Sequence, residues 1–115
     1  MTIRHMNPGP RMSQATIHAG VVYLSGQIAA PGEDVAVQTE AVLNAIDTLL
    51  QEAGSDRAHL LQATIWLSDM ADFPVMNEIW EKWLTDVKAP ARATGEVKLA
   101  SPDYKIEILV TAAVR

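Results

Sequence analysis

Apolar residues recur at helical spacing in two stretches of the chain, which predicts two amphipathic helices. The first runs from Val35 to Ala53, with Asp34 as N-cap and Gly54 where a left-handed residue often ends a helix. The second starts after Asp72, which we expect to cap it, and carries Pro74 in its first turn. Its apolar stripe comprises Phe73, Met76, Trp80, Trp83, Leu84 and Val87. On the first helix, the positions expected to face solvent are Gln38, Glu40, Asn44, Asp47 and Gln51.

Runs rich in β-forming residues, one of them strictly alternating, predict five strands around these helices. We expect residues 1–12 to be irregular, because Pro8, Gly9 and Pro10 disfavour both helix and strand. Gly26 lies inside one strand pattern and predicts a bulge or a close approach of the backbone to another group. The predicted strands are Ser13–His18, Val21–Ile28, Leu61–Ser68, Arg92–Leu99 and Tyr104–Ala113.

The element order β-β-α-β-α-β-β predicts an α+β fold. We expect residues 1–115 to form one domain with a single mixed sheet and two helices on one face. No predicted element covers the other face, which favours its burial against another subunit. In the strict alternation of Leu61 to Ser68, Leu61, Ala63, Ile65 and Leu67 share the buried face. The uncovered face is expected to carry Thr64, Trp66, Thr94, Glu107 and Leu109.

Composition narrows the class of protein. With 49% hydrophobic and 20% charged residues, the 115-residue chain is not of the disordered type. It has no cysteine, which excludes a disulfide scaffold and a thiol nucleophile. A net charge of −5 disfavours nucleic-acid partners. Without a long apolar run, we expect a cytoplasmic protein that acts on small molecules or other proteins.

Two charged residues lie in predicted strands, where charges are uncommon. Arg92 follows Pro90-Ala91 at the start of one strand, and Glu107 lies between Ile106 and Ile108 in another. A functional interpretation has Arg92 bind a carboxylate with its two-pronged guanidinium, and Glu107 position water or a ligand nitrogen. Spacing alone leaves open that both are ordinary surface charges. The histidines lie far apart on separate elements, so no metal site is predicted.

Short motifs in a fixed order run through nearly the whole chain, from about Pro10 to Ala113. Among them are Ser25-Gly26-Gln27-Ile28-Ala29, Asp69-Met70-Ala71-Asp72-Phe73, Met76-Asn77, Pro90-Ala91-Arg92 and Ile106-Glu107-Ile108. In this order and spacing the chain resembles the RidA (YjgF) family of reactive-intermediate deaminases.

The resemblance implies a chorismate-mutase-like fold and a homotrimer whose sheets form an inner barrel, with pockets between subunits. It also implies an activity, of the 2-iminobutanoate/2-iminopropanoate deaminase type. Such a hydrolase converts reactive 2-imino acids, such as 2-iminopropanoate or 2-iminobutanoate, and their enamines to 2-keto acids and ammonia. The resemblance implies no metal or organic cofactor. The negative net charge and the lack of a long apolar run add that no nucleic-acid or membrane partner is expected.

The resemblance also implies roles for individual residues. Arg92 matches the arginine that grips the substrate carboxylate, and Glu107 matches the glutamate that holds water or contacts the imine end. Ser25 and Gly26 match a pocket-lining loop. Asn77 matches the motif without an assigned role.

The chain departs from the family pattern at two places. Many members have an aromatic residue just before Ser13-Gln14 and a cysteine two residues after the arginine. Here Arg11-Met12 and Thr94 hold these positions, and we expect Met12 and Thr94 to line the substrate-binding pocket. Two alternatives therefore stay open: a non-catalytic trimeric module that binds small carboxylates or proteins, and a related hydrolase in pyrimidine or aromatic-nitrogen catabolism.

Overall fold

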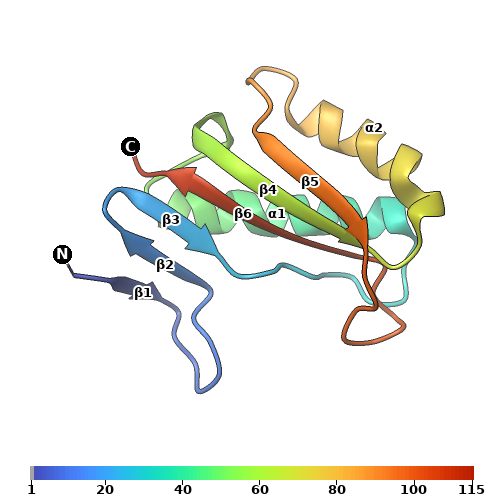
Figure 1. Ribbon diagram of the computed structural model, residues 1–115, viewed down its shortest axis with the longest axis horizontal. Coiled ribbons are helices and arrows are strands. Elements are labelled where there is room, and N and C mark those ends of the chain that lie inside the picture. The colour runs from blue at the N-terminus through green and yellow to red at the C-terminus, as the bar shows by residue number, and fades with distance from the viewer. Residues whose placement is uncertain (1) are drawn as a thin grey trace.

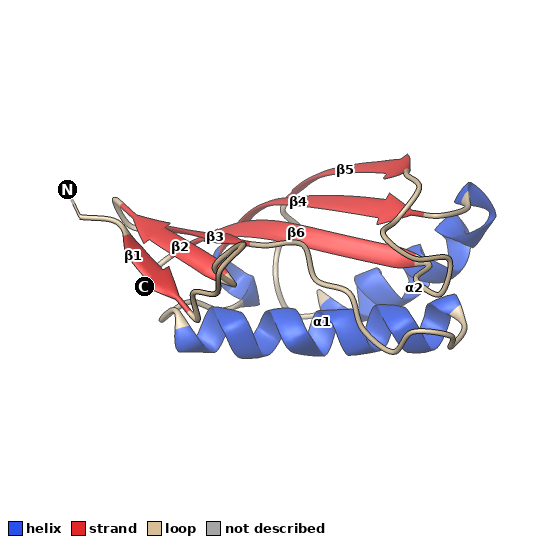
Figure 2. Cartoon of the chain, turned by 90° about the horizontal axis from the view of Figure 1, so that it is seen from below, coloured by secondary structure: helices blue, strands red, loops and turns tan. Residues whose placement is uncertain are grey.

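The computed structural model describes residues 2–115 and arranges them as one mixed sheet with two helices on one face (Figure 1; Figure 2). The strands follow the spatial order β1-β2-β3-β6-β4-β5, and only β4 and β5 pair in parallel. The helices are α1 (Val35–Glu52) and α2 (Phe73–Trp83). The strands are β1 (Arg4–Met6), β2 (Ala15–His18), β3 (Val21–Leu24), β4 (Leu60–Leu67), β5 (Ala91–Glu96) and β6 (Ile106–Ala113).

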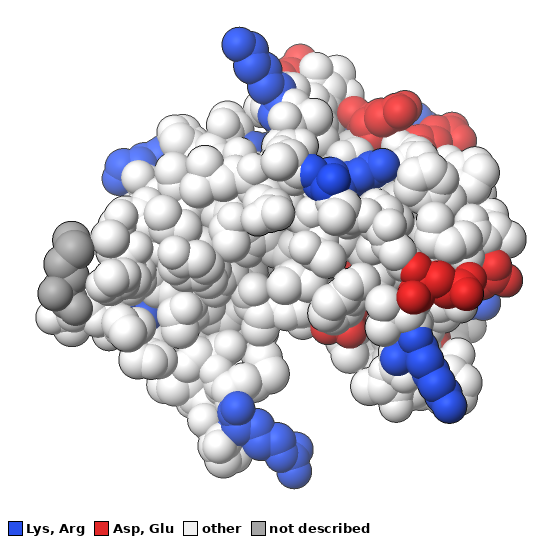
Figure 3. Space-filling view, in the orientation of Figure 1, with Lys and Arg blue, Asp and Glu red and all other residues white. Residues whose placement is uncertain are grey.

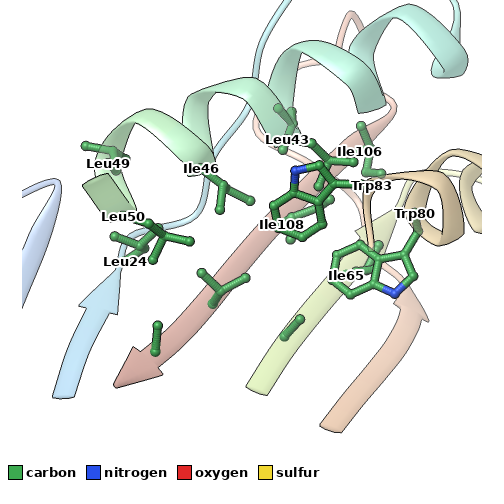
Figure 4. Packing of buried hydrophobic residues seen from close by; sticks show 14 of the residues in the cluster. Leu24, Leu43, Ile46, Leu49, Leu50, Ile65, Trp80, Trp83, Ile106 and Ile108 are labelled. Carbon is green, nitrogen blue, oxygen red and sulfur yellow. The ribbon is translucent and has the colours of Figure 1, made fainter. Parts of the chain in front are cut away.

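Helix α1 begins and ends as its sequence predicts. The Asp34 side chain accepts a hydrogen bond from the Val37 amide at 2.9 Å, which satisfies one of the free N–H groups of the first turn. Gly54 follows the helix with a φ of +80°, a conformation that glycine adopts without steric cost. The apolar stripe faces the sheet (Figure 4).

The core lies between the helices and the two central strands. Strands β4 and β6 pair antiparallel, so their alternating side chains share faces, and the apolar set points toward α1 and α2. Ala63, Ile65 and Leu67 of β4 have no exposed surface, and the same holds for Ile106, Ile108 and Ala112 of β6. Figure 4 shows Ile65, Ile106 and Ile108 among the side chains of the two helices.

The N-terminal segment is more regular than predicted. Arg4–Met6 forms strand β1 and pairs antiparallel with Ala15–Ile17. Met6 is buried in the core, and burial of this side chain offsets the cost of ordering a short edge strand. Strand β3 ends at Leu24 and β5 at Glu96, earlier than predicted.

Three local expectations are wrong. Leu61 was expected on the buried face but is 47% exposed, because a bulge between Leu60 and Gln62 shifts the register. Asp72 precedes α2 but its side chain makes no capping bond; Asp69 instead caps the preceding turn by accepting from the Ala71 amide at 2.8 Å. The third, Gln38, was expected to face solvent and is fully buried.

Both helices lie on one side of the sheet, and the other face carries no helix in the described part of the chain (Figure 2). Strand register places Tyr23, Thr64, Trp66, Glu107 and Leu109 on this open face. The expectation for Thr94 is wrong. It pairs with Ile65 and so points to the helix side. Among residues 2–115, no helix is long and apolar enough to cross a membrane.

Candidate functional site

Arg92 lies in β5, the edge strand of the sheet, and its side chain is seated on α2. Its pairing with the buried Ala63 turns it toward the helix side. Arginine Nη1 donates a hydrogen bond to Asn77 Oδ1 at 2.8 Å. The guanidinium carbon lies 5.6 Å from the Phe73 ring centre and 5.8 Å from that of Trp80, within cation–π range.

Glu107 lies on β6, opposite Trp66 of β4, and its side chain projects from the open face. The residue is half-buried. Burial raises the pKa of the Glu107 carboxyl above its usual value, because the charged form is poorly hydrated there. A carboxyl with a raised pKa holds and releases a proton closer to neutral pH than an ordinary glutamate.

The Ser25-Gly26-Gln27 segment runs beside β6 and covers this carboxyl. The Gln27 amide donates to the Ile108 carbonyl at 2.8 Å, and the Ile108 amide donates back to Gln27 at 3.2 Å. A Cβ atom on Gly26 would overlap the Glu107 carboxylate. The close approach that the sequence predicted at Gly26 is therefore confirmed, and its neighbour is the candidate catalytic group.

Hydrogen bonds within the segment and to Gln14, which directly precedes β2, hold the same segment in place. Gln27 Nε2 donates to Ser25 Oγ at 3.1 Å and to Gln14 Oε1 at 3.3 Å. The Ser25 amide donates to the Gln14 carbonyl at 2.9 Å. Ser25 is thus fixed next to the backbone that covers Glu107.

The two predicted catalytic residues lie on opposite faces of the sheet within one chain. Arg92 shares a row of the sheet with Ala63 and Val110, on the helix side. Glu107 lies three residues before Val110 on β6, on the open side. The sheet separates the two side chains, so any site that uses both must take one of them from another copy of the chain.

Of the two departures from the family pattern, Thr94 lies on the same side of β5 as Arg92. Its hydroxyl oxygen is buried and has no hydrogen-bond partner among residues 2–115. Met12 lies in the connection between β1 and β2, where the Gly9 amide donates to its carbonyl at 2.8 Å. The Met12 side chain is 48% exposed and lies on none of the strands that carry the other candidates.

The sequence did not assign the residues of α2 that seat Arg92. A usable signal existed, because Phe73, Asn77 and Trp80 follow i, i+4, i+7 spacing and share one helix face. Asn77 is a polar residue at the edge of an apolar stripe, which marks a position with a specific hydrogen-bond partner.

Other potential sites lie elsewhere. A groove of about 350 Å³ between α1 and α2 is lined by Glu40, Leu43 and Trp83, among others. A hollow of about 550 Å³ is formed by Ser68 and residues 96–102 with Tyr104. Neither contains Arg92 or Glu107. In residues 2–115, no three His, Cys, Asp or Glu side chains come together as a metal site.

The fold and these residues define a two-layer α+β protein with an arginine and a glutamate presented on opposite faces of one sheet. The family model described as Endoribonuclease L-PSP matches residues 2–114. A RutC family protein of Haemophilus influenzae is 40% identical over 114 residues, which cover 97% of this chain and 98% of that protein. The chain belongs to the RidA (YjgF) family, as its ordered motifs predicted.

Solved structures confirm the predicted fold. The crystal structure of NMB1025, a member of the YjgF protein family from Neisseria meningitidis, matches with a TM-score of 0.96 and 44% sequence identity. The match covers 100% of this chain and 97% of that chain. A further relative is named Reactive Intermediate Deaminase A, chloroplastic, from Arabidopsis thaliana. It is 36% identical over 103 residues, 84% of this chain and 54% of that protein.

Proposed function

We propose that this protein hydrolyses small 2-imino acids and their enamine tautomers to 2-keto acids and ammonia, in the cytoplasm. The observation that carries the proposal is the combination of two groups in a chain of this family. One is a guanidinium fixed on α2, at Arg92. The other is a half-buried carboxyl with a raised pKa, at Glu107. A relative that bears the name of a reactive intermediate deaminase supports the same reaction class.

The chemistry needs few groups. Arg92 binds the substrate carboxylate through parallel N–H donors, which fixes the imine carbon in place. Glu107 takes a proton from water as the water oxygen bonds to that carbon, and the proton passes to nitrogen. The hydroxyl group of the resulting tetrahedral adduct then gives up its proton, which Glu107 passes to nitrogen. The carbon–nitrogen bond breaks as the carbonyl forms, and ammonia leaves. Because an iminium carbon is already electrophilic, positioning and one proton-transfer group suffice.

We propose that the pocket lies between subunits of a homotrimer. Arg92 and Glu107 lie on opposite faces of their own sheet, so a neighbouring copy must supply the second group. The open face suits such contact, because it presents a broad uncharged area (Figure 3). Half-buried Trp66 and Leu109 belong to that face.

A second candidate function is a non-catalytic trimer that binds small carboxylates. It is favoured by Met12, whose exposed side chain has no group that could donate or accept a proton during hydrolysis. Such a binder would show a ligand-induced rise in melting temperature without turnover. Cleavage of RNA is not favoured, because the net charge of −5 repels a phosphate backbone.

The test is imine hydrolysis by the wild type, Arg92→Ala and Arg92→Lys. An amino-acid oxidase supplies 2-imino acids, and their loss is compared with spontaneous decay. We expect the wild type to accelerate the loss, Arg92→Ala to abolish the acceleration, and Arg92→Lys to lose most of it, since a point charge does not reproduce two parallel donors.

Arg4→Ala is the matched control, because Arg4 is exposed on β1, at the opposite edge of the sheet from the strand that carries Arg92. It should keep wild-type kcat/KM. A folded wild type that accelerates no imine across a series of side chains, yet binds the corresponding keto acids, would favour the binding function. Full activity in Arg92→Lys would contradict the anchoring role of Arg92.

A further inference from the structure

We propose that Phe73, Asn77 and Trp80 of α2 form a positioning platform for the Arg92 guanidinium, and that Asn77 sets its direction. The inference rests on the proposed function, because it concerns how the carboxylate anchor is held. Asn77 is a positioning residue: it acts on the substrate through Arg92.

The platform is one face of one helix. Its three residues are four and three positions apart, so they lie above one another along α2. Asn77 Oδ1 accepts from Arg92 Nη1 at 2.8 Å, and the two aromatic rings lie within 6 Å of the guanidinium carbon. Each of the three therefore contacts the same cation.

The platform is itself anchored in the core. Trp80 is buried, and its ring centre lies 5.3 Å from that of Trp83 (Figure 4). Trp83 Nε1 donates to Asp47 on α1 at 3.0 Å. Because α1 and the sheet hold these rings, the direction of Arg92 is set by rigid elements and not by a mobile loop.

Because the Asn77 side chain is neutral, Arg92 can be held in place and still bind a substrate carboxylate. Arg92 lies on an edge strand, and an exposed arginine there would sample many rotamers before it met a carboxylate. A neutral amide oxygen restrains the guanidinium without cancelling its charge. No ion pair within residues 2–115 involves Arg92. One donor on Nη1 is taken by Asn77, and the Nε–Nη2 edge keeps its two parallel donors for a substrate carboxylate.

This arrangement makes Asn77→Asp an informative variant. The new carboxylate has almost the same shape and lies where Asn77 Oδ1 contacts Arg92, so it forms an ion pair and competes with the substrate. We expect KM for a 2-imino acid and Kd for 2-oxobutanoate, the keto-acid product, to rise at least about 10-fold. The melting temperature should stay equal or rise, and kcat should change less than about 3-fold.

Two further variants sharpen the result. Asn77→Ala removes the acceptor without adding charge, and we expect a smaller rise in KM, about 3-fold, from lost orientation. Lys82→Gln makes the same change of net charge as Asn77→Asp on the same helix, and Lys82 pairs with Glu78 and not with Arg92. It should leave KM and Kd unchanged.

The outcomes separate the two proposals. If Asn77→Asp keeps wild-type KM and Kd in a wild type that turns over imines, the platform is wrong and the proposed function stands. If Asn77 variants lower the melting temperature but not the affinity, Asn77 has only a structural role. If the wild type binds 2-oxobutanoate without imine turnover, the proposed function fails. The Kd values of the Asn77 variants then test the platform by themselves: a rise in Asn77→Asp supports it, and an unchanged Kd contradicts it.

Discussion

At the scale of single residues, the close contact of Gly26 with Glu107 is the main feature of the candidate site on the open face. A side chain at position 26 would displace the Glu107 carboxylate, so only glycine leaves this space free. Glu107 is half-buried beside it. Burial keeps the pKa of Glu107 raised. Since the folded state holds this proton more tightly than the unfolded chain, the group favours folding at acidic pH, and this contribution is lost as the pH rises through the raised pKa.

We therefore expect Gly26→Ala to lower kcat for imine hydrolysis by about 10-fold or more, because the new methyl group must push the carboxylate out of place. Steady-state kinetics and a melting curve check this. Gly9→Ala is the control, since a Cβ there meets only the Met12 carbonyl oxygen at 3.5 Å, an ordinary contact. Unchanged kcat in Gly26→Ala would mean that the position of the Glu107 carboxylate is not critical.

At the scale of elements, one buried glutamine joins α1 to the loop that precedes β6. Gln38 Nε2 donates to the carbonyls of Glu33 at 2.8 Å and Asp103 at 3.0 Å. Its Oε1 accepts from the Lys105 amide at 2.9 Å. Because Lys105 comes just before β6, this side chain fixes where the strand that carries Glu107 begins.

Replacement of Gln38 by Leu should cost about 2–4 kcal/mol of unfolding free energy, because three part-buried backbone groups lose their hydrogen-bond partner while the side-chain volume stays similar. Urea denaturation followed by tryptophan fluorescence measures the loss. Gln51→Leu, an exposed position of the same helix, should change stability by less than about 0.5 kcal/mol. Equal effects of the two variants would show that the bonds of Gln38 add little.

At the scale of the whole molecule, the two faces of the sheet differ in what covers them. One is covered by α1 and α2 and holds the core, while the other is broad and uncharged in its middle (Figure 3). Leu109 lies in the central rows of this open face, paired with Thr64. A monomer would leave these apolar groups in water, which is the physical argument for the proposed assembly.

In the proposed assembly, Leu109→Lys should yield folded monomers without imine hydrolysis, because a charge would be buried between sheets. Light scattering after size exclusion gives the mass, circular dichroism gives the folding state, and the imine assay gives activity. Val37→Lys places the same charge on the exposed side of α1 and should keep both assembly and activity. Active monomers of Leu109→Lys would exclude a pocket shared between subunits.

Sequence patterns predicted the parts of this structure that depend on neighbours along the chain. Both helices follow from periodicity, although α2 ends at Trp83, before Leu84 and Val87 of its predicted stripe. The alternation of β4 beyond its bulge and that of β6 also follow from the pattern, and Gly26 was correctly expected to meet another group. The features that the sequence patterns missed depend on partners that are far away along the chain. Gln38 looked like a solvent-facing residue because the loop that it bonds lies 65 or more residues away.

The same reason explains the misjudged site residues. Asn77 had no role until β5 brought Arg92 to α2, and Thr94 was put on the wrong face because the register of β5 against β4 cannot be read from either strand. Motif order marked Arg92 and Glu107 as a pair, yet only the folded structure reveals that one sheet keeps them apart.

That separation has a genetic consequence for the proposed trimer. Each pocket would take its carboxylate-binding arginine from one chain and its proton-transfer glutamate from the next. A gene copy defective at Arg92 and another defective at Glu107 would therefore each encode an inactive protein. Expressed together, the two would complement each other, because every mixed ring contains one junction where an intact Arg92 meets an intact Glu107. Harmful alleles at these two positions would then be recessive to each other, although neither chain alone is functional.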